Sequence, residues 1–374
     1  MLSFVSIFVN TVFFSFLIIF PLYAQSLGAP VYVIGLLAVS FVLVRIIIQP
    51  LAGILFDTKN KYSVLLSGLI LYLIAFIIYN FLEYWQYLFV VRVIEGLGIA
   101  LLRPSLVAYI MAITKEGEYR RAFGLYNSLS YTSTIIGPLV GSLLYTLNRE
   151  IFFLFAEAVL LVSLVILLYL KSQVELHSFY AEKVSINFRD LKNASIFIVS
   201  LGNFFEYIGL GLFQIAFPLF VVNVLGLNAV YVGITYAIVG IGNILASQLW
   251  GNYGKSLHEL LIIGANLVMA STSILLYLSR NIFIIMLVAF VNAILINAMY
   301  TLWPAYIGRK VSTKGSAVGI ISAIQDSGNI LGYAISGYLY DVSYTFPFYF
   351  DSFFVFISGL TYLLGYFKEK RGVK

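Results

Sequence analysis

Long apolar stretches, separated by short polar or turn-rich breaks, follow one another along the whole 374-residue chain. An apolar helix of about 20 residues crosses the hydrocarbon core of a bilayer, so stretches of this length predict membrane spans. The pattern predicts twelve spans, six in each half of the chain. They cover residues 4–23, 33–56, 64–81, 87–113, 122–147 and 151–170, and then 195–222, 232–250, 260–278, 282–307, 316–340 and 348–367.

The second half of the chain repeats the first at an offset of roughly 198 residues. The recurring pairs are Pro21 and Pro218, Leu22 and Leu219, Tyr23 and Phe220, Gly28 and Gly226, Tyr32 and Tyr231, Gly35 and Gly233, Ala122 and Ala317, Gly124 and Gly319, and Gly137 and Gly332. The longest polar stretch separates the halves. We therefore expect an N-terminal six-helix bundle (1–170), a cytoplasmic central loop (171–193) and a C-terminal six-helix bundle (194–374). Two similar halves with one site between them are typical of transporters.

Composition agrees with an all-α membrane protein. Hydrophobic residues make up 61% of the chain and charged residues 10%, whereas soluble domains carry about 25% charged residues. The chain has no cysteine, which excludes disulfides and thiolate chemistry. No histidine lies in a predicted span, and the sequence contains neither Gly-x-Ser-x-Gly, His-Glu-x-x-His nor a P-loop. These features predict a protein that is not an enzyme, that holds no metal or other cofactor, and that does not use ATP.

The distribution of Lys and Arg predicts the orientation in the membrane. If the N-terminus is cytoplasmic, 17 of the 22 basic residues lie in inner loops or at the C-terminus, and only Arg149 and Arg280 lie in outer loops. Because cytoplasmic loops carry an excess of basic residues, both termini are expected in the cytoplasm of a multi-pass protein of the cell membrane. The net charge of +6 therefore reports topology and does not indicate nucleic-acid binding.

Ionisable residues inside the predicted spans are candidates for function, because each costs about 2.5–3.5 kcal/mol to insert and usually faces a cavity or a partner. Arg92 and Glu95 lie on one face of the fourth span, either as a functional pair or as an ion pair that neutralises both. Arg103 precedes Pro104 and either lines the same face or bridges to loop carboxylates. The full set is Arg45, Arg92, Glu95, Arg103, Glu157, Glu206 and Asp326.

Polar residues at helical spacing form stripes on the seventh and eleventh spans, and stripes of this kind favour a watery cavity over lipid. Glu206 and Asp326 are the leading candidates for proton coupling, because loss of water favours the protonated carboxyl group. In the alternative interpretation, both only hydrogen-bond to neighbouring helices. The stripes comprise Asn203, Glu206, Tyr207 and Gln214, and Ser322, Gln325, Asp326, Asn329, Tyr333 and Ser336.

Three motifs resemble those of the major facilitator superfamily. Residues 53–61 resemble its loop signature Gly-x-Leu-Ala-Asp-Arg-x-Gly-Arg-Lys, although Asn60 replaces a glycine. Arg92 to Gly98 resembles its Arg-x-x-x-Gly-x-Gly pattern in the fourth span. Residues 137–141 resemble its Gly-Pro-x-x-Gly motif in the fifth span, which is often associated with antiporters. The matching positions of the first and third motifs are Gly53, Leu55, Asp57 and Lys61, and Gly137, Pro138 and Gly141.

The resemblance covers almost the whole chain, is closest to the drug or metabolite efflux type, and implies two pseudo-symmetric six-helix bundles that move by alternating access. It also implies that Asp57 meets the start of the eleventh span near Gly315 and latches the outward-facing state. A monomer that binds a small-molecule substrate and protons within the lipid bilayer is the expected form.

We expect proton-coupled export of a small organic molecule. The alternative is uptake or exchange of a sugar, organic acid or other metabolite. Arg45, Arg92 and Arg103 suit an anionic substrate, because guanidinium groups bind carboxylate or phosphate through two hydrogen bonds.

Overall fold

In the computed structural model, every regular element of the described residues is a helix. The backbone is described for residues 2–58, 61–113, 119–171, 194–253, 258–310 and 314–372. Side chains are described for residues 2–49, 51, 62–106, 130–170, 197–250, 260–276, 278–298 and 321–367. The predicted central loop over 171–193 therefore lies almost entirely outside the described residues.

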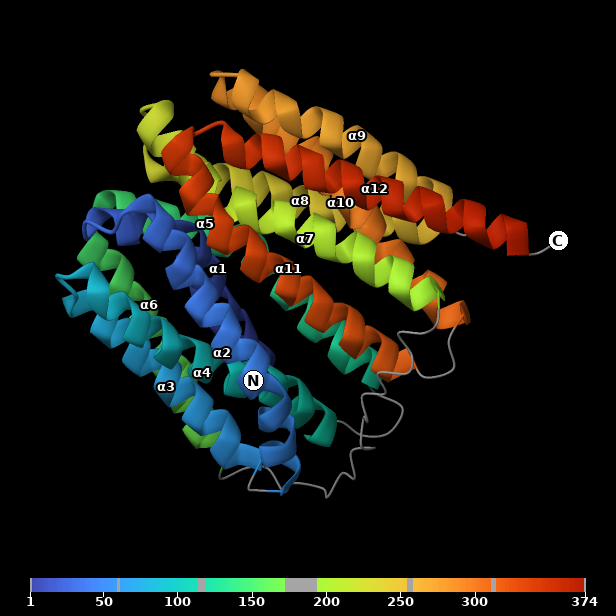
Figure 1. Cartoon of the computed structure of the whole chain (residues 1–374). Helices are drawn as coiled ribbons and strands as arrows, with labels where there is room; N and C mark the ends of the chain where they lie inside the picture. Colours follow the sequence, from blue (N-terminus) through green and yellow to red (C-terminus); the bar gives the residue numbers. More distant parts are fainter. Residues whose placement is uncertain are drawn as a thin grey trace. The chain divides into compact units, whose positions relative to one another are not determined.

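Twelve α-helices follow the order that the apolar pattern predicts (Figure 1). The first six are α1 (Leu2–Ser26), α2 (Val31–Thr58), α3 (Lys61–Phe81), α4 (Leu88–Ile113), α5 (Tyr119–Leu147) and α6 (Arg149–Lys171), with a short 3₁₀ helix η1 (Trp85–Tyr87) before α4. The second six are α7 (Ala194–Leu219), α8 (Ala229–Tyr253), α9 (His258–Leu278), α10 (Ile282–Lys310), α11 (Lys314–Val342) and α12 (Phe346–Gly372), with a π-helical turn η3 (Phe220–Val224) after α7.

Most of these helices are long and apolar enough to cross a bilayer. Within the described residues, eight helices meet that requirement, and the described parts of α9 and α10 form two shorter apolar helices. The side chains of residues 119–129 of α5 and 314–320 of α11 lie outside the described part. Because a helix satisfies its backbone hydrogen bonds internally, it is the element that an apolar sequence forms in lipid.

The chain divides into two compact units, Met1–Glu182 with Gly226–Ala237, and Lys183–Leu225 with Ile238–Lys374. Within the first unit, α1 packs on α5 and α6, and α3 packs on α4 and α6. Within the second, α7 packs on α11 and α12, and α9 packs on α10 and α12. These helix pairs correspond between the two units, which is the structural counterpart of the sequence repeat.

Two repeated glycines occupy equivalent helix ends. Gly28 follows α1 with φ +83°, and Gly226 follows η3 with φ +66°. At the end of α1, the Ala29 amide donates to Ala24 O over 3.1 Å and the Gly28 amide donates to Gln25 O over 2.9 Å, which is the hydrogen-bond pattern of a Schellman cap. A glycine stands at each site because a side chain disfavours positive φ.

Aromatic rings fill the interior of the first unit. The ring of Phe16 on α1 lies 5.2 Å from Phe76 and 4.7 Å from Tyr79 on α3, measured between centroids. It also lies 6.3 Å from Phe152 and 6.0 Å from Phe153 on α6. These contacts hold α1, α3 and α6 together. The pair with Phe152 is stacked and the others are tilted or edge-on, and ring pairs of these kinds add to the burial of apolar area.

Candidate functional site

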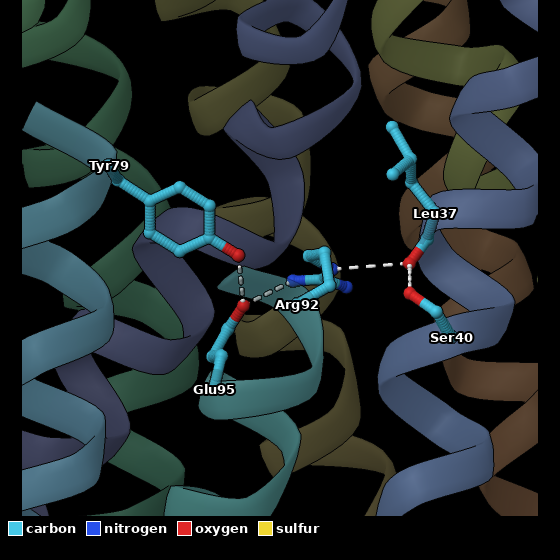
Figure 2. A network of polar contacts seen from close by, with 5 residues as sticks. All are labelled: Leu37, Ser40, Tyr79, Arg92 and Glu95. Carbon is cyan, nitrogen blue, oxygen red and sulfur yellow. Dashed lines mark hydrogen bonds and ion pairs between the residues drawn. The ribbon is translucent and has the colours of Figure 1, made fainter. Parts of the chain in front are cut away.

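Arg92 and Glu95 form a buried ion pair on α4 (Figure 2). Arg92 Nη1 lies 2.6 Å from Glu95 Oε2, and the side chains are 5% and 3% exposed. The Tyr79 hydroxyl of α3 donates to the same carboxylate oxygen over 2.7 Å, and Arg92 Nε donates to Leu37 O of α2 over 3.4 Å. The pair therefore ties α4 to both α2 and α3.

Aromatic faces complete the surroundings of Arg92. Its guanidinium carbon lies 4.1 Å from the centroid of the Phe20 ring and 4.4 Å from that of the Phe41 ring. A cation is attracted to the electron-rich face of an aromatic ring, most strongly where water is absent. Charge, hydrogen bonds and ring contacts thus compensate for the burial of both ionised groups.

The two other arginines of the predicted set also lie against phenylalanine rings in the first unit. Arg45 on α2 is half-buried, and its guanidinium carbon lies 5.9 Å from the Phe41 ring. Arg103 on α4 is half-buried and lies 4.8 Å from the Phe13 ring of α1. On α6, Glu157 accepts a hydrogen bond from Asn80 Nδ2 over 3.1 Å.

Polar residues of α7 and α11 meet inside the second unit. Gln325 Nε2 donates to Asn203 Oδ1 over 2.5 Å, and Asn203 Nδ2 donates to the hydroxyl of Tyr362 on α12 over 3.0 Å. Nearer the end of α7, the Tyr333 hydroxyl donates to Gln214 Oε1. These contacts join the two predicted stripes to each other.

Other members of the stripes differ in exposure. Asp326 and Tyr207 are half-buried, whereas Asn329 is buried. Asn329 Oδ1 has no hydrogen-bond partner among the described residues. Tyr207 packs against the buried cluster that includes Val199.

Glu206 on α7 is fully buried, and its carboxyl group lies beside the Ser358 hydroxyl of α12. It lines a cavity inside the second unit together with Asp351 of α12, which is 5% exposed. Asp351 is absent from the set predicted from sequence. The available signal was one acidic residue within the apolar stretch that forms the twelfth span.

The Gly-Pro-x-x-Gly segment of α5 lies against α1 in the first unit. A Cβ added to Gly137 would lie 2.8 Å from Thr11 O, and one added to Gly141 would lie 2.5 Å from Ser15 Cβ. The Ser15 hydroxyl donates to Gly137 O over 2.7 Å. Small residues and this hydrogen bond bring the two helices into close contact, while Pro138 stays within the helix.

The loop motif lies where α2 ends and α3 begins. Gly53 and Asp57 belong to the end of α2, and Lys61 is the first residue of α3. Their side chains, like those of Tyr126 and Asn127 on α5, lie outside the described residues. The expected contact of Asp57 with the start of the eleventh span stays a prediction.

Comparison with known families and proteins identifies the class of this chain. The Major Facilitator Superfamily model matches residues 2–257 and 199–374. The chain is 25% identical to Multidrug resistance protein 2 of Bacillus subtilis (strain 168), an alignment that covers 90% of this chain and 86% of that protein. It is also 25% identical to the quinolone resistance protein NorA of Staphylococcus aureus (strain MSSA476), with 88% and 87% covered.

Solved structures agree on the fold. The crystal structure of the nucleoside transporter NupG (D323A mutant) matches with a TM-score of 0.80 at 14% identity, covering 97% of this chain and 98% of that one. The chain belongs to the major facilitator superfamily: it is a multi-pass membrane transporter and not an enzyme. The family and the twelve-helix fold expected from the sequence are confirmed.

Proposed function

We propose that the protein exports small lipophilic organic molecules in exchange for protons. The observation that carries this proposal is Glu206, a carboxyl group at the middle of a membrane helix that is fully buried and has no basic partner among the described residues. An unpaired carboxylate is costly in such a place, so the group favours a proton. The resistance proteins named above are consistent with lipophilic drugs as the substrate class.

The surroundings of the arginines support export over uptake of an anion. Arg92 is already bonded to Glu95, and the guanidinium groups of Arg45 and Arg103 lie over phenylalanine rings. An anionic substrate would have to compete with Glu95 for Arg92. A lipophilic cation needs only an apolar site and a carboxyl group that releases its proton.

Alternating access supplies the cycle in this proposal. Protonation of Glu206, with Asp326 as the second candidate, favours one orientation of the site, and release of the proton favours the other. A ligand shifts such an equilibrium only through unequal affinity for the two states. Net export then follows the proton gradient without chemical change in the substrate. Both termini lie in the cytoplasm in this proposal.

Purified protein in liposomes tests the transport reaction. Under an imposed pH gradient, we expect movement of ethidium, a fluorescent lipophilic cation, with the wild type, and background movement with Glu206→Gln. Asp326→Asn measures how much the second carboxyl group contributes to gradient-driven ethidium movement. Proton flux that begins only when sugars or organic acids are added, with no ethidium movement, would contradict drug export and favour metabolite transport.

Orientation can be tested with introduced cysteines, because the chain has none of its own. In intact cells, a membrane-impermeant maleimide should label Tyr84→Cys, between α3 and α4, and should label Ser178→Cys in the central polar segment only after permeabilisation. The reverse labelling pattern would contradict the cytoplasmic location of the termini.

A further inference from the structure

A cavity of about 100 Å³ lies inside the second unit, between α7, α8, α9, α10 and α12. Its lining is mostly apolar, from residues such as Phe213 and Ile296. Four polar side chains interrupt this lining, one each from α7, α9, α10 and α12: Glu206, Ser273, Asn292 and Asp351. None of the described residues that line the cavity is basic. Two acidic groups therefore share one cavity with neutral neighbours.

Each of the two carboxyl groups lies beside a serine hydroxyl. The Glu206 carboxyl group lies beside the Ser358 hydroxyl of α12. Asp351 is hydrogen-bonded to the Ser273 hydroxyl, which in turn accepts from Asn292 Nδ2 over 3.2 Å. A serine that donates to a carboxylate stabilises its ionised form. The polar chain on α9 and α10 gives Asp351 hydrogen-bonded neighbours, and no described residue of the cavity lining supplies a countercharge to either carboxyl group.

Gly209 makes room for Asp351 on α7. It lies one helical turn after Glu206, and a Cβ at this position would overlap Asp351 Oδ1. Glycine at 209 therefore lets the Asp351 carboxyl approach the α7 backbone close to Glu206. The titratable groups within electrostatic reach of Glu206 in the described part of the unit are Asp351 and the phenol of Tyr362, both on α12.

We propose that Glu206 and Asp351 form one buried proton site, in which Asp351 is the second carboxyl group of the coupling reaction. Two ionised carboxylates in a largely apolar cavity repel each other, so the pair retains one proton between them. The site takes up one proton from one side of the membrane and releases it to the other. This inference rests on the proposed proton-coupled export and assigns its coupling site to the interior of the second unit.

Transport assays test the role of Asp351. Ethidium movement is measured in liposomes with and without a pH gradient, for wild type, Glu206→Gln, Asp351→Asn, Asp351→Glu and the double variant Glu206→Gln/Asp351→Asn. We expect each neutral variant to lose gradient-driven movement and to retain exchange without a gradient, the double variant to be no worse than either single one, and Asp351→Glu to regain part of the loss. The control is Asp341→Asn, an exposed carboxyl group outside the cavity.

Infrared spectroscopy of the purified protein provides a readout that does not depend on the substrate. The carbonyl stretch of a protonated carboxyl group should be present in the wild type at neutral pH and lost in Glu206→Gln, and its pH dependence should move in Asp351→Asn. Gradient-driven movement at the wild-type rate in Asp351→Asn would overturn the proposal. So would a carbonyl signal that neither substitution alters.

The two proposals fail in different ways. If ethidium and other lipophilic cations do not move while the infrared signal responds to both substitutions, the export function is wrong and the proton site stands. If gradient-driven movement depends on Glu206 alone, export stands and the assignment of Asp351 is wrong.

Discussion

Counted back from the proline that α1 and α7 share, Val9 and Val12 on α1 correspond to Glu206 and Gly209 on α7. Both valines are fully buried. The two helices thus occupy equivalent places in their units, and each packs on the matching pair of neighbours. At these positions α1 carries apolar side chains. In contrast, α7 carries the Glu206 carboxyl group and, at Gly209, leaves space for the Asp351 carboxyl group. The repeat preserves the packing of these helices, but the side chains of the two halves differ at the candidate site.

The two units also differ in the neighbours of their buried ionisable groups. In the first, Glu95 is paired with Arg92 and hydrogen-bonded to Tyr79, so the charges cancel. In the second, Glu206 and Asp351 share a cavity without a described basic neighbour. An ion pair of opposite charges gains little by exchanging a proton. Two like charges in one cavity repel each other, and binding of a proton to one of them removes this repulsion. In the proposed mechanism, the polar network of the first unit is structural and that of the second unit exchanges the proton.

The largest expected effect comes from making α7 resemble α1. Glu206→Val should reduce gradient-driven ethidium movement in liposomes to the level of empty vesicles, because no proton can bind at that position. Folding should be unaffected or improved, since an unpaired buried polar group disappears. The matched control is Val162→Leu, an exposed apolar position on α6. Residual gradient-driven movement would show that Glu206 is not the coupling group.

The next effect concerns the balanced pair of the first unit. Glu95→Leu leaves the Arg92 charge uncompensated in the interior and should lower the free energy of unfolding by about 3–5 kcal/mol. The double variant Arg92→Leu/Glu95→Leu should recover most of this loss, because replacement of a whole ion pair by apolar residues is often neutral. Unfolding in detergent, followed by circular dichroism, measures all three proteins. Equal losses in the single and double variants would contradict the ion-pair explanation.

A smaller effect on stability is expected in both units, because in each unit two helices make close contact at a glycine. A Cβ on Gly137 would crowd the α1 backbone, and one on Gly332 would overlap Ile208 O of α7. Gly137→Val and Gly332→Val should each destabilise the protein by about 1–3 kcal/mol through overpacking. Gly264→Val is the control, since a Cβ there meets open space. A large difference between the first two variants would mean that the units do not pack equivalently.

The smallest predicted effect is the loss of one interhelical hydrogen bond in each unit. The Ser15 hydroxyl donates to Gly137 O over 2.7 Å, and the Ser336 hydroxyl donates to Leu212 O over 2.9 Å. Ser15→Ala and Ser336→Ala should each reduce the free energy of unfolding by about 1 kcal/mol. Ser271→Ala, which removes an exposed bond within α9, should have no measurable effect. If both buried variants match this control, helix contact alone holds these pairs together.

The twelve helices, the repeat and the family were predictable from sequence, because their causes are local. In lipid, a backbone must bond to itself, so an apolar stretch of sufficient length forms a helix whatever surrounds it. Gly28 and Gly226 mark equivalent helix ends through their own backbone conformation. The motif around Gly137 indicated close packing, since glycine permits contact with any neighbour.

The partners of the buried polar groups were decided by tertiary structure. The stripe on α7 predicted that Asn203 faces a watery cavity, but the structure places it between Gln325 and Tyr362. Nothing in the sequence around Tyr79 pointed to Glu95.

Asp351 is distant from Glu206 in the chain, and only the packing of α12 on α7 brings their carboxyl groups to one cavity. The composition of a span reveals that a polar group is buried. Whether that group finds a countercharge, a hydrogen bond or a second carboxyl depends on the helices that fold against it.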